Sequence, residues 1–131
     1  MEIVIQLAVF LENKPGTMAR MCRALEKEKI NILALTVSDT VDHAVVRMVV
    51  SDTHKAVHLL EVHNVLVVES EVLMIESDNR PGSLAGIAER LAKAKINVEY
   101  AYMTSGYRTK KGLMIIRPGN VQKALKVLTR K

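Results

Sequence analysis

Residues 13–37 read NKPGTMARMCRALEKEKINILALTV, and residues 79–103 read NRPGSLAGIAERLAKAKINVEYAYM. Shifting the chain by 66 residues aligns the two stretches, and nine of the 25 aligned positions are identical. The identical pairs are Asn13/Asn79, Pro15/Pro81, Gly16/Gly82, Ala19/Ala85, Leu25/Leu91, Lys27/Lys93, Lys29/Lys95, Ile30/Ile96 and Asn31/Asn97. Self-similarity of this extent indicates an internal repeat, so we expect one structural unit to occur twice.

The first copy predicts the element order βαββαβ. Its apolar, β-branched run predicts a buried strand, and after the Pro-Gly turn apolar residues recur at the i, i+3, i+4, i+7 spacing of a helix. The predicted elements are a strand at 3–11, a helix with Met18, Met21, Cys22 and Leu25 inward, a strand at 30–37, a loop at 38–43, a strand at 44–50, a helix at 51–63 capped by Ser51 or Asp52 with Ala56, Leu59 and Leu60 inward, and a strand at 65–70. Because Ala88 aligns with Cys22, we interpret Cys22 as a small core residue.

The second copy repeats the pattern but ends early. Its predicted elements are strands at 72–77, 97–104 and 112–117, a hairpin loop at 105–110, and helices at 82–94 and 120–129. Too few residues follow to form a fourth strand, and the missing strand would leave an exposed sheet edge. Either residues 1–5 or another chain could cover that edge. We expect domains at 1–70 and 71–131, and a homo-oligomer that buries the edge.

Composition limits the class of protein. The 131 residues are 49% hydrophobic and 25% charged, which is typical of a globular protein with a proper core. The single cysteine excludes an internal disulfide and favours a reducing compartment. No signal peptide and no apolar run of about 20 residues is evident, so we expect a cytoplasmic protein without a membrane partner. The formal charge of +5 permits binding to nucleic acid but is modest and not concentrated, so we do not expect a nucleic-acid partner.

The repeated turn is the best clue to a binding site. Pro15 is expected at the first helical position, which leaves the N–H groups of Gly16, Thr17 and Met18 without helical partners. The corresponding residues of the second copy are Pro81, Gly82, Ser83 and Leu84. Free N–H groups at a helix start can bind a carboxylate or phosphate. The same turn sequence also forms without any ligand, so turn shape alone does not establish a site.

The two stretches together resemble an ACT domain written twice. The resemblance rests on an Asn-x-Pro-Gly turn, an amphipathic helix and an Ile-Asn pair entering a strand, and it covers both halves apart from the missing last strand. It implies an α+β fold of two ferredoxin-like βαββαβ units in tandem, with antiparallel sheets and helices on one face. It also implies a regulatory module that binds an amino acid at the interface between two ACT-like units.

The resemblance implies specific ligand-binding residues. Asn13 and Asn79 match an Asn of the loop after the first strand, and Asn31 and Asn97 match one just before the second strand. The backbone around each Pro-Gly turn would take part as well. The copies differ near the turn, with Leu11 against Ser77 and Arg20 against Gly86, so the two sites need not bind equally.

Other functions find less support. His54 and His58 have i, i+4 spacing but no third ligand, so no metal site is expected. No nucleophile–base pair and no phosphate loop is present, so we expect neither an enzyme nor a cofactor. Tyr100 and Tyr102 share a face of a predicted strand, as RNA-binding aromatics do, but other aromatics are lacking. The sequence therefore favours an amino-acid sensor that regulates a partner enzyme. The alternatives are an interaction module with a vestigial site and, less favoured, an RNA-binding protein.

Overall fold

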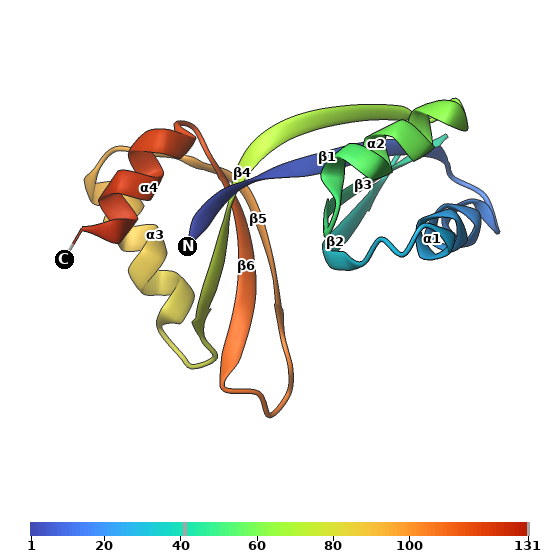
Figure 1. Cartoon of the computed structure of the whole chain (residues 1–131). Coiled ribbons are helices and arrows are strands. Elements are labelled where there is room, and N and C mark those ends of the chain that lie inside the picture. The colour runs from blue at the N-terminus through green and yellow to red at the C-terminus, as the bar shows by residue number, and fades with distance from the viewer. Residues whose placement is uncertain (41, 131) are drawn as a thin grey trace. The chain divides into compact units, whose positions relative to one another are not determined.

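The computed structural model describes residues 1–40 and 42–130, which form two compact units. The N-terminal unit comprises Ile5–Ser70, and the C-terminal unit comprises Met1–Val4 together with Glu71–Lys131. The elements are β1 (Glu2–Glu12), α1 (Thr17–Lys27), β2 (Ile32–Asp39), β3 (His43–Val50), α2 (Thr53–Val62), β4 (Leu66–Asp78), α3 (Ser83–Lys93), β5 (Val98–Ser105), β6 (Lys111–Pro118) and α4 (Val121–Thr129) (Figure 1). Among the described residues no helix is long and apolar enough to cross a bilayer.

The N-terminal unit has the strand order β2-β3-β1-β4 of a βαββαβ fold. β3 pairs in an antiparallel manner with both β1 and β2. Alternate residues of β1 and β3, such as Leu7, Val9 and Met48, point to one face and form a core with Leu25 of α1 and Leu60 of α2. Both helices therefore cover the same face of the sheet.

The C-terminal unit repeats this arrangement with the order β1-β4-β6-β5. β6 pairs in an antiparallel manner with β4 and β5, and α3 and α4 lie together on one side of these strands (Figure 1). Leu73 and Ile116 of the sheet pack against Leu91 of α3 and Leu128 of α4. The predicted ferredoxin-like α+β fold is thus confirmed in both units.

The strand missing from the C-terminal sequence is supplied by the N-terminus. β1 lies beside β4, and Met1–Val4 belong to the compact unit formed by residues 71 onward. Ile3 packs against the core of this unit, whereas Ile5 packs against the other core. Two ways of covering the edge were predicted, by residues 1–5 or by another chain. The structure shows the first. The exposed edge is therefore no longer a reason to expect an oligomer.

The repeated turn differs from its prediction, because neither proline lies in a helix. Gly16 is the N-cap of α1 and Gly82 the N-cap of α3, and their φ angles are 89° and 88°. The Thr17 N–H donates to the Lys14 carbonyl at 3.4 Å, and the Ser83 N–H donates to the Arg80 carbonyl at 3.2 Å. Proline followed by a glycine of positive φ, closed by such a bond, is a type II β-turn.

Two further core predictions need correction. Met18 was expected to face inward, but its exposed fraction is 39%, and that of its counterpart Leu84 is 44%. They occupy the first turn of each helix, beyond the reach of the sheet's apolar face. Cys22 is half-buried against the N-terminal core, whereas its counterpart Ala88 is exposed.

The shared strand predicts different effects for two neighbouring isoleucines. Ile3→Ala should lower the free energy of unfolding of the C-terminal unit by about 1–2 kcal/mol, less than a fully buried isoleucine would cost. Ile5→Ala is the matched control, because it removes the same atoms from the same strand but from the N-terminal core. Amide hydrogen exchange should show faster exchange in β5 and β6 for Ile3→Ala and in β2 and β3 for Ile5→Ala. Faster exchange of the same strands in both variants would contradict this assignment.

The type II turn predicts opposite effects for two glycines four residues apart. Gly82→Ala should destabilise the protein by about 1–2 kcal/mol, because alanine is strained at positive φ even though nothing lies within 4 Å of the added Cβ. Gly86→Ala, in the interior of α3 and equally unobstructed, should stabilise it by about 0.5–1 kcal/mol. Urea unfolding measures both changes. Equal destabilisation by both substitutions would argue against the turn geometry.

Candidate functional site

Each unit has a cavity beside its Pro-Gly turn. The first turn cavity has a volume of about 320 Å³ and is lined by Leu11, Thr17, Arg20, Met21, Ala24, Leu60, His63 and Val65. The second turn cavity has a volume of about 410 Å³ and is lined by Met1, Ile75, Glu76, Ser77, Asp78, Arg80, Gly82, Ser83, Gly86, Ile87, Arg90 and Lys111.

The two cavities occupy equivalent places in the repeat. Five lining positions correspond under the shift of 66 residues, namely Leu11/Ser77, Thr17/Ser83, Arg20/Gly86, Met21/Ile87 and Ala24/Arg90. Val65 lines the first cavity just before β4, and Met1 lines the second just before β1. The residue just before the strand that completes each unit thus also lines the cavity of that unit.

The helices beside these cavities begin without side-chain caps. The N-caps of α1 and α3 are glycines and make no side-chain cap hydrogen bond. By contrast, the side chain of Asp52 accepts a bond from the Lys55 N–H at 3.1 Å at the start of α2, and that of Asn120 accepts one from the Lys123 N–H at 3.0 Å at the start of α4. N–H groups in the first turns of α1 and α3 therefore remain available to an anionic group, and the helix dipole favours one there.

The first turn cavity is apolar with one cation at its rim. Leu11, Met21 and Leu60 belong to the buried core. Arg20 is exposed, and among the described residues its guanidinium forms no hydrogen bond or ion pair. A Cβ atom built on Gly16 would lie 3.1 Å from a guanidinium nitrogen of Arg20, which places this charge next to the turn. The arrangement suits a molecule with an aliphatic part and a negative group.

The second turn cavity is more polar, and most of its charges are already paired. Lys111 Nζ lies 2.7 Å from Asp78 Oδ1, and Arg80 Nε lies 3.6 Å from Asp78 Oδ2. The hydrogen bond and charge of Lys111, with a smaller effect of Arg80, hold the pKa of Asp78 below its usual value. In the part of the chain that the structure describes, the hydroxyl of Ser77 is buried without a hydrogen-bond partner. This hydroxyl is a polar group that a ligand in the cavity could satisfy.

Arg90 also lines the second turn cavity, and the sequence did not predict it as a site residue. Its guanidinium donates to the carbonyls of Val127 at 2.7 Å, Leu128 at 3.1 Å and Arg130 at 2.8 Å. These are carbonyls at the end of α4, where a helix leaves its acceptors unsatisfied. Arg90 therefore acts mainly as a link between α3 and α4.

The two predicted turn asparagines do not line the cavities, although they lie close in sequence to residues that do, and they bind the neighbouring hairpin loops. Asn13 Nδ2 donates to the Thr40 carbonyl at 3.2 Å. Asn79 Nδ2 donates to the carbonyls of Gly106 at 3.0 Å and Thr109 at 2.9 Å. The donor side of each amide is thus used within the fold, and the acceptor oxygen is the part that these bonds leave for a ligand.

Asn31 and Asn97 are not brought together with the turns. Asn31 lies at the end of the sheet where its carbonyl accepts the Ser51 N–H at 2.9 Å, while Asn13 lies at the other end of β3, where β1 and His43 pair. Eight residues of β3 separate the two ends, or about 23 Å at strand spacing. Asn97 is placed in the same way, because its carbonyl accepts the Gly119 N–H at 2.9 Å after β6.

Other candidate sites gain no support from the geometry. Among the described residues no group of three or more His, Cys, Asp or Glu side chains could hold a metal ion. Tyr100 and Tyr102 are half-buried on β5, beside Arg117 and Ile115 of β6.

Comparisons with known proteins agree with the repeat and the fold. The family described as ACT domain pair matches residues 1–131. The crystal structure of a protein from Bacteroides thetaiotaomicron is 33% identical, with a TM-score of 0.90 over 96% of this chain and 86% of that one. The ligand-free regulatory subunit of aspartate kinase from Thermus thermophilus is 15% identical, with a TM-score of 0.69 over 98% of this chain and 95% of that one. The corresponding subunit from Thermus flavus is 16% identical, with a TM-score of 0.62 over the same shares of both chains. None of the curated proteins matches the sequence.

The asparagine bonds predict unequal losses of stability. Asn79→Ala removes two hydrogen bonds to its hairpin loop and should lower the free energy of unfolding by about 1–2 kcal/mol. Asn13→Ala removes one longer bond and should cost about 0.5–1 kcal/mol. Urea denaturation measures both values, and a larger loss for Asn13→Ala would contradict the structure. These costs must be subtracted when either variant is used to test ligand binding.

Proposed function

Because this chain belongs to the ACT domain pair family, we propose that it is a regulatory protein that binds a small molecule, most simply an amino acid, beside its two Pro-Gly turns. The main observation that supports this proposal is the pair of cavities at equivalent positions, each next to a helix that begins without a side-chain cap. A helix start of this kind suits an α-carboxylate.

The proposal assigns roles to particular groups. The N–H groups of Gly16 and Met18 receive the carboxylate in the first site, and those of Gly82 and Leu84 receive it in the second. The N–H groups of Thr17 and Ser83 already donate to the carbonyls of Lys14 and Arg80, so they hold the turn and do not contact the ligand. The amide oxygens of Asn13 and Asn79 accept a bond from the ligand's ammonium group. Asn31 and Asn97, at the other end of each sheet, hold the backbone in place and do not contact this ligand.

Regulation follows if a second ACT-like unit, from another copy of the chain, closes the site. A ligand that contacts two units stabilises the assembly that brings them together. No catalytic family is indicated for this chain, so we propose that it acts on a partner enzyme in the cytoplasm. Two similar folds are regulatory subunits of aspartate kinases, which is consistent with this role. At these low sequence identities, the structural similarity is evidence for a shared fold only.

The two cavities are proposed to differ in ligand preference. The first, with Leu11 and an unpaired Arg20, favours an aliphatic ligand, because its walls are apolar. The second, with Ser77 and Gly86 at the same positions, favours a smaller or more polar one.

Thermal unfolding in the presence of each of the twenty amino acids tests the proposal. A ligand at ten times its Kd should stabilise the protein by about 1.4 kcal/mol, which corresponds to a rise in Tm of about 3–6 °C. Asn13→Ala and Asn79→Ala, each compared with its own ligand-free Tm, then identify the binding copy. Flat curves for all twenty at millimolar concentration would reject the amino-acid ligand and favour a protein-interaction module with a vestigial site.

A further inference from the structure

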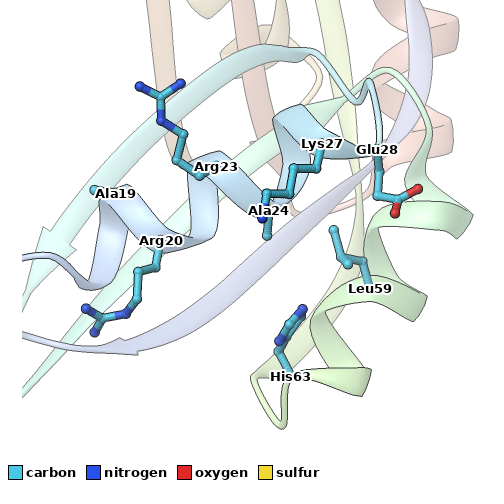
Figure 2. Close-up of a pocket in the computed structure, with 8 residues that line it drawn as sticks. All are labelled: Ala19, Arg20, Arg23, Ala24, Lys27, Glu28, Leu59 and His63. Atoms are coloured by element: carbon cyan, nitrogen blue, oxygen red, sulfur yellow. The ribbon is translucent and has the colours of Figure 1, made fainter.

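A second kind of site lies between the two helices of the N-terminal unit. A groove of about 470 Å³ separates α1 from α2. Figure 2 shows Ala24 and Lys27 on the α1 side of this groove and Leu59 and His63 on the α2 side. Arg20 lines the groove near the start of α1.

The groove carries positive charge that the fold does not neutralise. Arg23, on the same helix, is bound to Glu26 at 2.7 Å, and Glu28 is paired with Lys55 at 3.4 Å. Among residues 1–40 and 42–130, the side chains of Arg20 and Lys27 form no hydrogen bond or ion pair. The charge of Arg20 contributes only a small part of the lowering of the Glu12 pKa, which Lys14 dominates. An exposed guanidinium beside an apolar surface is well suited to bind a carboxylate whose body covers that surface.

The second repeat shows what closes such a groove. Arg90 is the counterpart of Ala24, and it spans from α3 to the last carbonyls of α4. Gly86 is the counterpart of Arg20, so the cation is missing there too. The N-terminal unit thus has the small Ala24 where the C-terminal unit has the bridging Arg90. It also has the unpaired cation of Arg20 where the C-terminal unit has Gly86.

The groove adjoins the first turn cavity, because Arg20, Ala24 and His63 line both. The turn cavity adds the aliphatic walls of Leu11 and Leu60. Arg20 therefore lies at the junction of a charged groove and an apolar cavity. A molecule that bridges the two needs an anionic group and an aliphatic body of several carbons.

We propose that the groove between α1 and α2 binds a small organic carboxylate with an aliphatic body, whose carboxylate pairs with Arg20 while its body lies over Ala24 and Leu59. This site requires neither the turn asparagines nor the N–H groups at the helix start, so it is additional to the amino-acid sites proposed above. An ammonium group on the ligand is not needed, because no acidic residue at the junction is free to receive it.

Titration with hexanoate, followed by amide chemical shifts of the full-length protein, tests the site. Hexanoate should shift the amides of Ala19, Ala24 and Leu59 in a saturable manner. The counterparts Ala85, Arg90 and Leu125 serve as internal controls and should not move. Hexylamine, which has the same body but the opposite charge, and acetate, which has the same charge but no body, should each bind at least about tenfold more weakly.

Two substitutions separate the site from general effects. Ala24→Arg places in the first repeat the residue of the second and should weaken hexanoate binding at least about tenfold. Ala92→Arg, which adds the same charge to the exposed face of α3, should change binding less than about twofold. Arg20→Ala should also weaken binding severalfold, and Arg108→Ala, which removes an exposed arginine of the C-terminal unit, should not.

The outcomes are distinguishable from those of the amino-acid screen. Unsaturable shifts, equal binding of hexylamine, or unchanged binding to both Ala24→Arg and Arg20→Ala would overturn the groove site, whatever any amino acid does. If the Ala24→Arg variant does not fold, hexanoate binding to the Arg20→Ala variant still tests the groove site, because Arg20 is exposed and its loss should not prevent folding. Hexanoate binding with flat amino-acid melting curves would support the groove and reject the amino-acid function.

Discussion

A ferredoxin-like unit needs four strands to bury the apolar face against its two helices, but the C-terminal half of this chain encodes only three. The long strands β1 and β4 meet this requirement by serving both units. The first residues of β1 complete the C-terminal unit, and the first residues of β4 complete the N-terminal one. The second turn cavity also depends on this exchange, since Met1 forms part of its lining.

The two copies keep the residues that shape the backbone and change those that face the cavities. Lys29 and Lys95 both have a φ of 58°, and the N–H groups of Ile30 and Ile96 close the same bond to a leucine carbonyl five residues earlier. This pattern is the Schellman motif that ends a helix, so these identities serve the fold. The changed positions, such as Arg20 against Gly86, alter charge and volume without disturbing the backbone. Divergence of ligand chemistry on a fixed scaffold is consistent with this distribution.

Much of the fold could be predicted from the sequence, because repeat, periodicity and turn residues all agree. The strand at 44–50 and the helix at 120–129, for example, lie within one residue of the observed β3 and α4. The place of Pro15 was wrong, although Pro-Gly at the two central positions is itself the signal of a type II turn. The sharing of β1 was left open between two alternatives, since strand pairing depends on long-range contacts that local patterns do not encode.

Less of the candidate site could be predicted. Asn31 was grouped with Asn13 by family resemblance, but a helix of 11 residues carries the chain to the opposite end of the sheet between them. Arg20, Arg23 and Lys27 of α1 are exposed. That Arg20 and Lys27 also line a groove depends on the position of α2, which no periodicity specifies. Arg90 could have been noticed as a large, charged residue at the position of the small Ala24 in the first copy.

The use of β1 by both units also constrains how the chain is made. Residues 2–4 are synthesised before the rest of both units, yet the sheet that they complete is the later of the two to be synthesised. The N-terminal unit can close as soon as β4 is available, while the first residues of β1 complete a sheet whose other strands begin about 70 residues later in the chain. Such a distant pairing slows folding. A fragment that starts at residue 71 would have an open strand edge, and a second fragment could occupy it. Splitting this gene between its two repeats would therefore produce one nearly complete unit and one unit prone to exchange strands.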